Sequence, residues 1–595
     1  MMSRWSRPLM AASAGVAGGL LVATLVGIQP AQVVIQTPGE RLAEIDLVTF
    51  FVLNALFGVI YLQLWGKEYS ADMPDRLMAS LVYGVIWWLL IALVVIPLAG
   101  GHPPRWHVQA AADALPALIS AIGQGIWMAL TLPPLLRWRQ QAAAESIPPI
   151  RKPTARRIVI LGGGFAGVTV ARQLEHLLRD DEGTEIVLVS ETNYLLFTPM
   201  LSEVVGGSVE PQHISTPLRT FFRRTRLIQA RIHQVDLAHR EVKLAAGTAP
   251  QLVSLSYHHL VLAVGAVPDF FGNHSVERHA FPFKSLGDAI RLRDHIIEQM
   301  ERADATPDSA MRRALLTFMV AGGGFAGVEL AGALNDFVRG ALRFYPNILP
   351  EEISLYLVHS RERLLPELSP ALAEFARRKL TERGVIVKLH SRVTTATAGY
   401  VMLESGEGFP AQTLIWTAGN RANPLVATLK LKTDPRGRIQ TDSTLAVPGH
   451  PGLWAVGDCA AIPNRATGEI APPTAQHATR AAAVLAYNIW ATLHGRPPKT
   501  FAHRNVGALA VLGHQTACAE LYGICFAGML AWWLWRGIYL AKLPTLQKKF
   551  RVSLDWLVDL FFPRDIVELA TIPGAHLRPA SATLAAPAEN RRAEK

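Results

Sequence analysis

The heptapeptide Gly-Gly-Gly-Phe-Ala-Gly-Val occurs twice in this chain, at Gly162–Val168 and again at Gly322–Val328. Each copy follows a short apolar run, Ile158–Leu161 in the first case and Phe318–Ala321 in the second, and each opens a helix-like stretch. In the spacing G-x-G-x-x-G, the first glycine makes the turn, the second lets the backbone approach a pyrophosphate, and the third lets helix and strand pack closely. One copy is a weak signal, but two copies in this context predict two bound dinucleotides.

We expect each loop to bind its own dinucleotide. The loop residues are Gly162, Gly164, Phe165, Ala166 and Gly167 in the first copy, and Gly322, Gly324 and Gly327 in the second.

Beyond the first loop, the pattern continues as a strand–helix–strand unit. Ile186–Val189 is predicted to be the second strand, and Glu191 lies just past its end. An acid roughly 20 residues after such a loop binds the ribose hydroxyls of an adenosine. Glu191 is therefore the candidate ribose ligand, and a solvated loop acid is the alternative.

Two later stretches complete the first nucleotide domain. Tyr257–Gly265 is predicted to be a buried strand that ends in a tight Ala-x-Gly turn at Gly265, and Gly452–Asp458 an apolar strand that ends in Gly-Asp. In flavoproteins with two dinucleotides, an Asp in this position accepts a hydrogen bond from a flavin ribityl hydroxyl. We therefore expect FAD to be bound by two halves of one domain, with the second nucleotide domain inserted between them.

The sequence of the inserted domain does not decide between NADH and NADPH. Its second strand, Ile353–Val358, ends at His359 rather than at an acid, and the segment Ser360–Arg363 contains two arginines. An acid here favours NADH, whereas a nearby arginine favours the 2′-phosphate of NADPH. Leu414–Gly419 is predicted to be the last structural segment of this domain.

The composition points to a membrane-associated part. The chain has 595 residues, of which 50% are hydrophobic and only 18% charged, too long for one domain and unusually apolar for a soluble enzyme. The apolar segments before the first loop are Leu9–Ile28, Leu47–Gly66, Met78–Gly100 and Ala110–Leu136. The first three are long enough to span a bilayer as helices, and no A-x-A cleavage site marks the first as a signal peptide.

The basic residues predict the orientation of these segments. Lys and Arg gather before the first segment, between the second and third, and after the fourth, which places both ends of the module and the remaining chain on the cytoplasmic side. The net charge of +11 suits an anionic membrane surface better than nucleic acid. We expect a multi-pass protein of the cell inner membrane, in which the module acts as an anchor or partner contact.

The C-terminal region carries a second membrane signal. Gly528–Lys542 is rich in Trp and Leu, and Val552–Phe562 has a similar makeup. Interfacial amphipathic helices have this composition, and a domain core or a dimer helix is the alternative. The Ala- and Pro-rich end after about Pro573 is predicted to be disordered.

The cysteines limit the chemistry. Cys459, Cys518 and Cys525 are the only three, and none belongs to a C-x-x-C pair. This pattern argues against a disulfide framework and against a metal site.

Several stretches together resemble a known family. The two loops, the Ala-x-Gly turn, Trp416–Gly419 and Gly457-Asp458 resemble the flavoproteins with two dinucleotide-binding domains. The stretches that narrow the resemblance to type II NADH dehydrogenase, the single-subunit NADH:quinone oxidoreductase, are Tyr194–Leu201, Ala280–Leu286, Gly327–Gly332 and Pro472–Ala478. The resemblance covers roughly Arg156 to Val567.

The resemblance implies specific roles. FAD would be bound by the first loop with Glu191, Thr198, Pro199, Gly265 and Asp458, and the nicotinamide nucleotide by the second loop with His359 and Gly419. Glu329 would lie near nicotinamide and flavin, and Gln476 would line the quinone site. The chain departs from the family pattern at Arg480, which replaces a second Gln beside the quinone, and at His359, which replaces an acid.

The predicted fold class is α/β, with two Rossmann-like domains, a four-helix transmembrane module and C-terminal membrane-binding helices. The predicted domains are the transmembrane module 1–150, the FAD domain 155–285 and 426–495, the NAD(P)H domain 286–425, the C-terminal region 496–572 and the tail 573–595.

The predicted reaction passes a hydride from NADH to FAD and then two electrons to membrane quinone, without proton pumping. The alternatives are an NADPH-dependent reductase of another quinone or apolar acceptor, and a nucleotide-binding membrane regulator without turnover. Expected partners are quinone and the lipid bilayer, with no metal and no nucleic acid, and a homodimer is left open.

Overall fold

The computed structural model describes residues 16–17, 47–65, 73–95, 98, 115–141, 156–245 and 252–568. The chain divides into two compact units, Met1–Ile150 with Thr545–Phe550, and Arg151–Pro544 with Arg551–Lys595. Both Gly-rich loops belong to the second unit.

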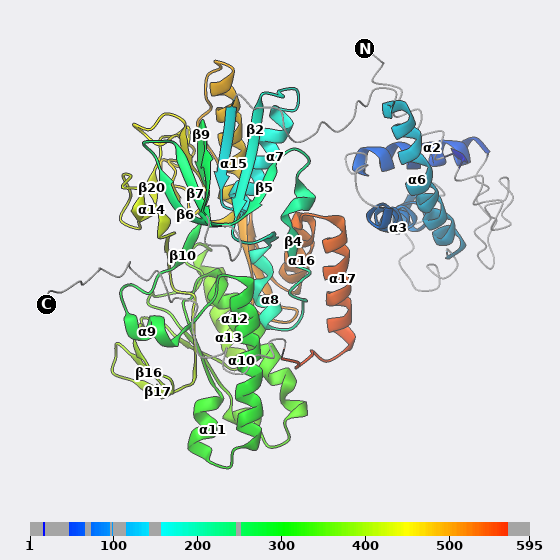
Figure 1. Ribbon diagram of the computed structural model, residues 1–595. Coiled ribbons are helices and arrows are strands. Elements are labelled where there is room, and N and C mark those ends of the chain that lie inside the picture. The colour runs from blue at the N-terminus through cyan, green and yellow to red at the C-terminus, as the bar shows by residue number, and fades with distance from the viewer. Residues whose placement is uncertain are drawn as a thin grey trace, which may run out of the picture. The chain divides into compact units, whose positions relative to one another are not determined.

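A five-stranded parallel sheet organises the first nucleotide domain (Figure 1), with the strand order β21-β9-β1-β2-β5. The strands are β1 (Arg156–Leu161), β2 (Thr184–Ser190), β5 (Arg226–Gln229), β9 (His259–Leu262) and β21 (Leu453–Ala455). The apolar run Ile158–Leu161 is completely buried in the central strand, as expected for a parallel sheet covered on both faces. Helices α7 (Phe165–Leu177) and α15 (Ala475–Leu493) pack against each other in this domain.

A second five-stranded parallel sheet has the order β11-β18-β12-β13-β14. Its strands are β11 (Phe281–Pro282), β12 (Thr317–Ala321), β13 (Ser354–Val358), β14 (Val385–Lys388) and β18 (Thr413–Trp416). The chain leaves the first sheet after β9, builds the second sheet, and returns to the first with β21. The predicted α/β fold with two Rossmann-like sheets is confirmed.

Three small antiparallel sheets accompany the two parallel ones. They are β6 (Arg231–Asp236) with β7 (Glu241–Ala245) and β8 (Leu252–Ser256), β15 (Val393–Ala396) with β16 (Tyr400–Leu403) and β17 (Gly408–Pro410), and β23 (Gly507–Val511) with β24 (Ala517–Leu521) and β25 (Ile524–Gly528). Two-stranded pairs are β3 (Tyr194–Leu196) with β4 (Ser215–Pro217), β10 (Ala266–Pro268) with β19 (Asn420–Ala422), and β20 (Ile439–Gln440) with β22 (Ala460–Ala461).

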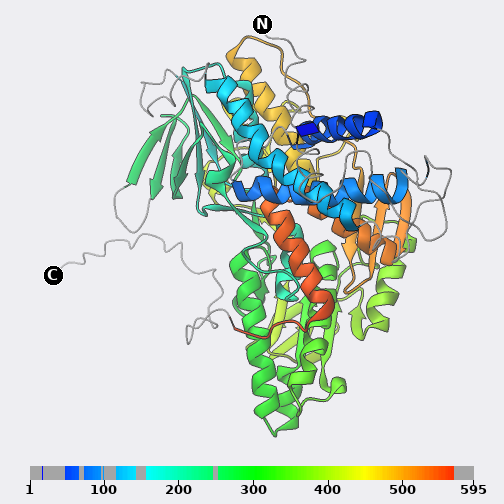
Figure 2. The same ribbon diagram turned by 90° about the vertical axis from the view of Figure 1, so that its right-hand side faces the viewer.

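The remaining helices after β1 lie mostly around the second sheet, apart from α14, which packs into the apolar core of the first sheet (Figures 1 and 2). They are α8 (Leu201–Val205), α9 (His274–His279), α10 (Leu286–Ala305), α11 (Ser309–Leu315), α12 (Phe325–Ala341), α13 (Pro370–Glu382), α14 (Leu425–Thr428), α16 (Met529–Lys542) and α17 (Leu546–Phe561).

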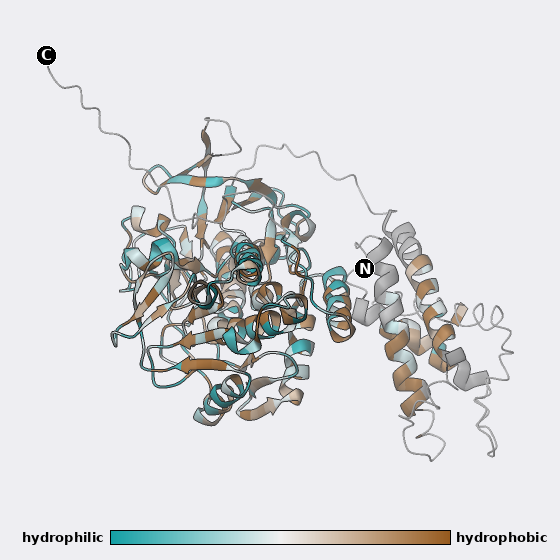
Figure 3. Ribbon diagram, turned by 90° about the horizontal axis from the view of Figure 1, so that it is seen from below, coloured by the Kyte–Doolittle hydropathy of each residue, from teal (hydrophilic) through white to brown (hydrophobic). Residues whose placement is uncertain are grey.

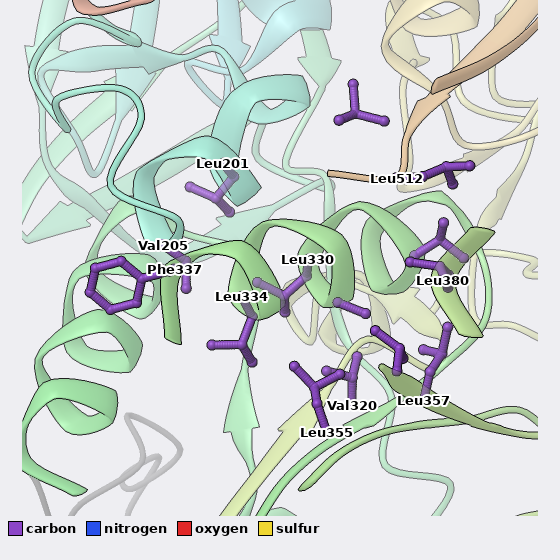
Figure 4. Packing of buried hydrophobic residues seen from close by; sticks show 14 of the residues in the cluster. Leu201, Val205, Val320, Leu330, Leu334, Phe337, Leu355, Leu357, Leu380 and Leu512 are labelled. Atoms are coloured by element: carbon purple, nitrogen blue, oxygen red, sulfur yellow. The ribbon is translucent and has the colours of Figure 1, made fainter. Parts of the chain in front are cut away.

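Helix α12 lies at the centre of the largest apolar cluster (Figure 4). Its Leu330 and Leu334 are completely buried and share the cluster with Leu355 of β13, Leu201 of α8 and Leu512, which follows β23. Burying each such side chain contributes about 1.5–3 kcal/mol relative to leaving it in water. The helix therefore joins the second sheet, the segment after β3 and the C-terminal strands into one core.

The two Gly-rich loops share one backbone geometry. Gly162 and Gly322 have φ values of +116° and +123°, which favour glycine over residues with a side chain. A Cβ on Gly167 would overlap the carbonyl oxygen of Gly162, and a Cβ on Gly327 would overlap that of Gly322. The repeated sequence therefore folds the same way twice, because each helix starts directly against its strand.

The first unit contains helices α2 (Leu47–Trp65), α3 (Met73–Leu90) and α6 (Leu115–Gln141), with a short π-helix, Ile91–Val95, after α3. These helices consist mainly of apolar residues (Figure 3). Helices α3 and α6 approach closely, since a Cβ on Gly84 would lie 2.7 Å from the carbonyl oxygen of Ala121. Buried polar contacts include a 2.6 Å hydrogen bond from Gln124 Nε2 to Asn54 Oδ1.

Within the described residues, no helix combines the length and the apolar character that crossing a membrane requires. The predicted four-helix transmembrane module and multi-pass topology are therefore not confirmed. Of the first predicted span, Leu9–Ile28, all but Val16 and Ala17 lie outside the described residues, as does the tail 573–595.

Two glycines of one helix test the role of the close approach. Gly327→Ala inserts a methyl group into the carbonyl of Gly322 and is expected to lower the free energy of unfolding by at least about 2 kcal/mol. The matched control is Gly340→Ala, because Gly340 lies in the same helix with open space around its Cα. This control should be neutral or stabilising by about 0.5–1 kcal/mol. Urea unfolding of both variants measures the difference, and equal effects would contradict the explanation.

Candidate functional site

The first loop offers a cradle for a pyrophosphate. Helix α7 begins after Gly164, whose side-chain position faces open space, and no side chain caps the helix N-terminus. Free backbone N–H groups and the helix dipole favour an anion at such a helix start. The residues present therefore fit the phosphates of a dinucleotide.

Three neighbouring strands carry the predicted FAD residues to one edge of the first sheet. The loop follows β1, Gly265 follows β9, and Asp458 follows β21, and these strands are parallel neighbours. A Cβ on Gly457 would lie 3.2 Å from Cβ of Ala166, so the Gly-Asp turn touches the first loop directly. The structure thus brings Asp458 to the loop across nearly 300 residues of intervening chain, a distance that only the sheet topology closes.

Asp458 has a partner that the sequence did not single out. Lys284 Nζ lies 3.5 Å from Asp458 Oδ2 and 3.4 Å from Asn420 Oδ1. Lys284 belongs to the Ala280–Leu286 stretch that carried the resemblance. Lys284 therefore provides a cation beside Asp458 at the edge of the first sheet.

Glu191 lies just past the end of β2, as predicted. Its side chain is 62% exposed, and its Oε1 lies 3.7 Å from Arg231 Nε. The residue against the loop is Ser190, because a Cβ on Gly163 would overlap its Oγ. The ribose role of Glu191 stays a prediction.

The second loop has His359 in the corresponding place. The N–H of Gly323 donates to His359 Nδ1 at 3.0 Å, so Nε2 carries the proton of the neutral ring. Burial, and then the nearby Arg361 guanidinium, lower the pKa of His359, while a hydrogen bond to the Arg363 backbone opposes them. His359 is therefore a neutral group that fixes the loop backbone.

Three further predicted residues lie near the ends of other strands. Gly419 has a φ of +113°, which favours glycine, and follows β18 at the edge where the second loop lies. Thr198 and Pro199 form a short 3-10 turn, Thr198–Met200, directly after β3.

Glu329 is buried beneath the C-terminal region rather than exposed at the loop. Its Oε1 accepts hydrogen bonds from Val511 N at 3.3 Å and from Trp535 Nε1 at 3.2 Å. Burial raises the pKa of Glu329 to about 8, against the effect of these two hydrogen bonds. The side chain is therefore mostly protonated at neutral pH, with Oε2 free to carry the proton.

A second buried carboxyl group, absent from the sequence prediction, mirrors this arrangement. Glu203 Oε2 accepts hydrogen bonds from Trp556 Nε1 and from Ser208 Oγ, both at 2.9 Å. The rings of Trp535 and Trp556 lie 6.2 Å apart. In the sequence, Glu203 appears only as an acid within an apolar stretch, and this pattern does not reveal which residue it contacts.

The predicted quinone residues lie at the start of α15. Gln476 is half-buried in the first turn, and Arg480 is exposed one turn later. Arg480 lies close enough to Lys542 of α16 and to His503 to lower the pKa of both, in each case after the larger effect of burial. This end of α15 is thus strongly basic.

Aromatic side chains connect the first loop with the C-terminal helices. The ring of Phe165 lies 6.0 Å from that of Phe197, which lies 6.1 Å from Tyr539, which lies 4.7 Å from Trp535. An apolar, aromatic environment of this kind suits a flat, hydrophobic ligand.

Two of the three cysteines are buried, and Cys525 is exposed. Cys459 is completely buried, its Sγ donates to the carbonyl of Leu262 at 3.4 Å, and burial raises the pKa of its thiol to about 11. Burial likewise raises the pKa of Cys518 to about 12. Neither thiol forms the reactive thiolate at neutral pH.

Comparisons with known proteins agree with the geometry. The family described as pyridine nucleotide-disulphide oxidoreductase matches residues 156–482, and the family described as NDH2 C-terminal domain matches residues 505–565. The chain is 31% identical over 418 residues to a probable NADH dehydrogenase of Dictyostelium discoideum, covering 69% of this chain and 90% of that relative. It is 29% identical over 432 residues to a type II NADH:quinone oxidoreductase of Mycobacterium tuberculosis, covering 70% and 90%.

The fold also matches a solved structure. The structure of NDH2 from Plasmodium falciparum in complex with NADH superposes with a TM-score of 0.65 at 20% identity, over 69% of this chain and 99% of that chain. This match shows that the two proteins share a fold.

The pKa of Glu329 makes a prediction about stability. A carboxyl group whose pKa rises from 4.5 to about 8 on folding binds more protons in the folded state, so its contribution to stability falls as pH rises between these values. Glu329→Gln removes the titration and keeps an oxygen for Trp535 and Val511. The stability of this variant relative to wild type should grow by about 1.4 kcal/mol per pH unit in that window. Urea unfolding between pH 5 and about 8 measures it, and a pH-independent difference would refute the assignment.

Proposed function

Because this chain belongs to the type II NADH dehydrogenases of the pyridine nucleotide-disulphide oxidoreductase family, we propose that it oxidises NADH through FAD and reduces a membrane quinone without pumping protons. The observation that carries this proposal is the pair of identical strand–loop–helix cradles in two interleaved parallel sheets. Two cradles in one chain fit an enzyme that binds a nicotinamide nucleotide and a flavin together.

We assign FAD to the first loop and the nicotinamide nucleotide to the second. The first sheet is built from two separate stretches of chain, and Asp458 reaches the first loop only through the second of them. Bound FAD would accept a hydride and pass on two electrons. The protein's part is to bind the two dinucleotides, with Asp458 and Lys284 as a polar pair at the edge of the first sheet.

Glu329 has a defined part in this scheme. It keeps a proton inside the protein at neutral pH, since burial favours its neutral form, and its carboxyl is fixed by Trp535 of α16. The protonated carboxyl group of Glu329 is shielded from water, and such a group can supply a proton when a quinone is reduced.

On the acceptor side, an apolar quinone is a better fit than a disulfide or thiol substrate. The three cysteines form no pair, and two are buried with raised thiol pKa values. The aromatic side chains between Phe165 and Trp535 provide an apolar environment, and Gln476 and Arg480 are the proposed polar contacts of the quinone head group.

Membrane attachment is part of the proposal. Large apolar side chains of α16 and α17 are exposed, among them Leu530 (60%), Trp533 (57%) and Phe561 (75%), and a bilayer surface would cover them. The apolar N-terminal segments would anchor the enzyme in the cell inner membrane, and the basic residues beside them favour a cytoplasmic position for the catalytic part.

Spectroscopy of the full chain in detergent tests this function. The purified protein is expected to contain FAD, to lose its oxidised flavin absorbance when NADH is added without oxygen, and to recover it when a quinone follows. Asp458→Ala should purify with less FAD than wild type. Protein that binds nucleotides but shows no bleaching would favour the regulator alternative.

Arg480 provides a separate test of the quinone site. Arg480→Ala removes the side-chain donor and is expected to raise the KM for quinone by roughly two- to tenfold, the worth of one hydrogen bond, with the KM for NADH unchanged. The matched control is Arg496→Ala, which truncates an exposed arginine just beyond the same helix. Steady-state kinetics with each substrate varied measures both KM values. An equal rise in the KM for quinone in both variants would exclude a specific role of Arg480.

A further inference from the structure

The two nucleotide domains can be compared position by position, because their loops have the same hydrogen bonds. The N–H of Gly162 donates to the carbonyl of Val189, and that of Gly322 to the carbonyl of Val358, both at 2.8 Å. Val189 and Val358 are therefore equivalent positions in β2 and β13.

The equivalence continues past the strand ends. The carbonyl of Ser190 accepts a hydrogen bond from Ala230 N at 3.0 Å, and that of His359 accepts one from Ser391 N at 2.9 Å. In each domain the donor follows the neighbouring parallel strand. Segment 190–192 of the first domain therefore corresponds to 359–361 of the second.

The charges in these segments are opposite. Glu191 in the first domain is an exposed carboxylate whose counter-ion is Arg231, 3.7 Å away. Its equivalent in the second domain is Ser360, an exposed hydroxyl, and Arg361 follows with an exposed side chain. The nearest acid along the chain is Glu362, beyond these positions. The second domain has therefore replaced an anion with a hydroxyl and a cation.

The backbone of Arg361 is held in place by the turn around it. The N–H of His390 donates to its carbonyl at 3.1 Å, and the N–H of His359 donates to the carbonyl of Lys388 at 2.8 Å, so the turn is anchored at both sides. The guanidinium makes no hydrogen bond or ion pair with any residue that the structure describes. Arg363 differs, since its Nη2 donates to the carbonyl of Pro366 at 3.1 Å.

His359 positions this turn through its contact with the second loop. Its Nδ1 is occupied by the N–H of Gly323, and a Cβ on Gly323 would lie 2.6 Å from its ring. The imidazole therefore fills the space between loop and turn, and directs the next two residues outward at the loop where an adenosine ribose is expected.

We propose that Ser360 and Arg361 form a binding site for the 2′-phosphate of NADPH, so that the enzyme uses NADPH as well as NADH. The inference rests on the proposed function, which assigns the second loop to the nicotinamide nucleotide. A guanidinium pairs with a phosphate through charged, often bidentate hydrogen bonds, and a serine hydroxyl donates one more. An acid at position 360, like Glu191 in the first domain, would instead repel the phosphate.

The first test measures fragment binding, which needs no turnover. The FAD-loaded full chain is titrated by calorimetry with 2′,5′-ADP and with 5′-AMP, which lacks the second phosphate. Wild type is expected to bind 2′,5′-ADP about tenfold more tightly or better, the worth of hydrogen bonds to a charged group. Arg361→Ala should lose most of this preference. The matched control Arg378→Ala, which removes an exposed arginine of α13 in the same domain, should retain it.

The second test uses the acid of the first domain as a template. Ser360→Glu should lower kcat/KM for NADPH by tenfold or more, with kcat/KM for NADH changed by less than a factor of about two. Equal binding of both fragments by wild type, or an undiminished preference in Arg361→Ala, would overturn the proposal. A failure of the proposed oxidoreductase function would appear differently, as absent flavin bleaching with either nucleotide while fragment binding still distinguishes the variants.

Discussion

The close approach of each helix to its strand is the constraint on which the second unit depends. In both loops the third glycine lies against the carbonyl of the first, Gly167 against Gly162 and Gly327 against Gly322, with no room for a side chain. This contact brings the N-terminus of α7 or α12 to the carboxyl edge of its sheet, where the ligand binds. It also fixes the angle at which α12 enters the core that joins the second sheet to the C-terminal strands.

The C-terminal region is connected to the nucleotide domains by buried polar contacts as well as by apolar packing. Two carboxyl groups, Glu329 and Glu203, accept indole N–H groups from Trp535 and Trp556. Arg536 lies between the aromatic rings of this region, 3.8 Å from the Trp532 ring centroid and 4.6 Å from that of Trp556. Buried polar groups are stable only with partners, so these contacts specify where α16 and α17 sit. The same contacts couple the proposed proton donor to the helices that would face the quinone.

Much of the fold was visible in the sequence because it depends on local rules. A fully buried parallel strand needs a continuous apolar run, and Ile158–Leu161 and Phe318–Ala321 are such runs. The turn after each run needs glycine for its backbone angle and for the approach of the helix. Residues at strand ends were harder to place, since a shift of one position exchanges the residue against the loop for one in solvent. The contact of Ser190 with the first loop, and the equivalence of Ser360 with Glu191, therefore emerged only from the tertiary structure.

The sequence by itself determined the α/β class, the duplicated loops and the family resemblance, because each follows from short stretches whose geometry neighbouring residues dictate. Only the tertiary structure decided which distant residues meet, such as Asp458 with Lys284 and Glu329 with Trp535. It also decided that Glu329 is neutral and that Glu203 has an indole partner. Burial and partner choice depend on how sheets and helices pack, and no local pattern encodes the environment that packing creates.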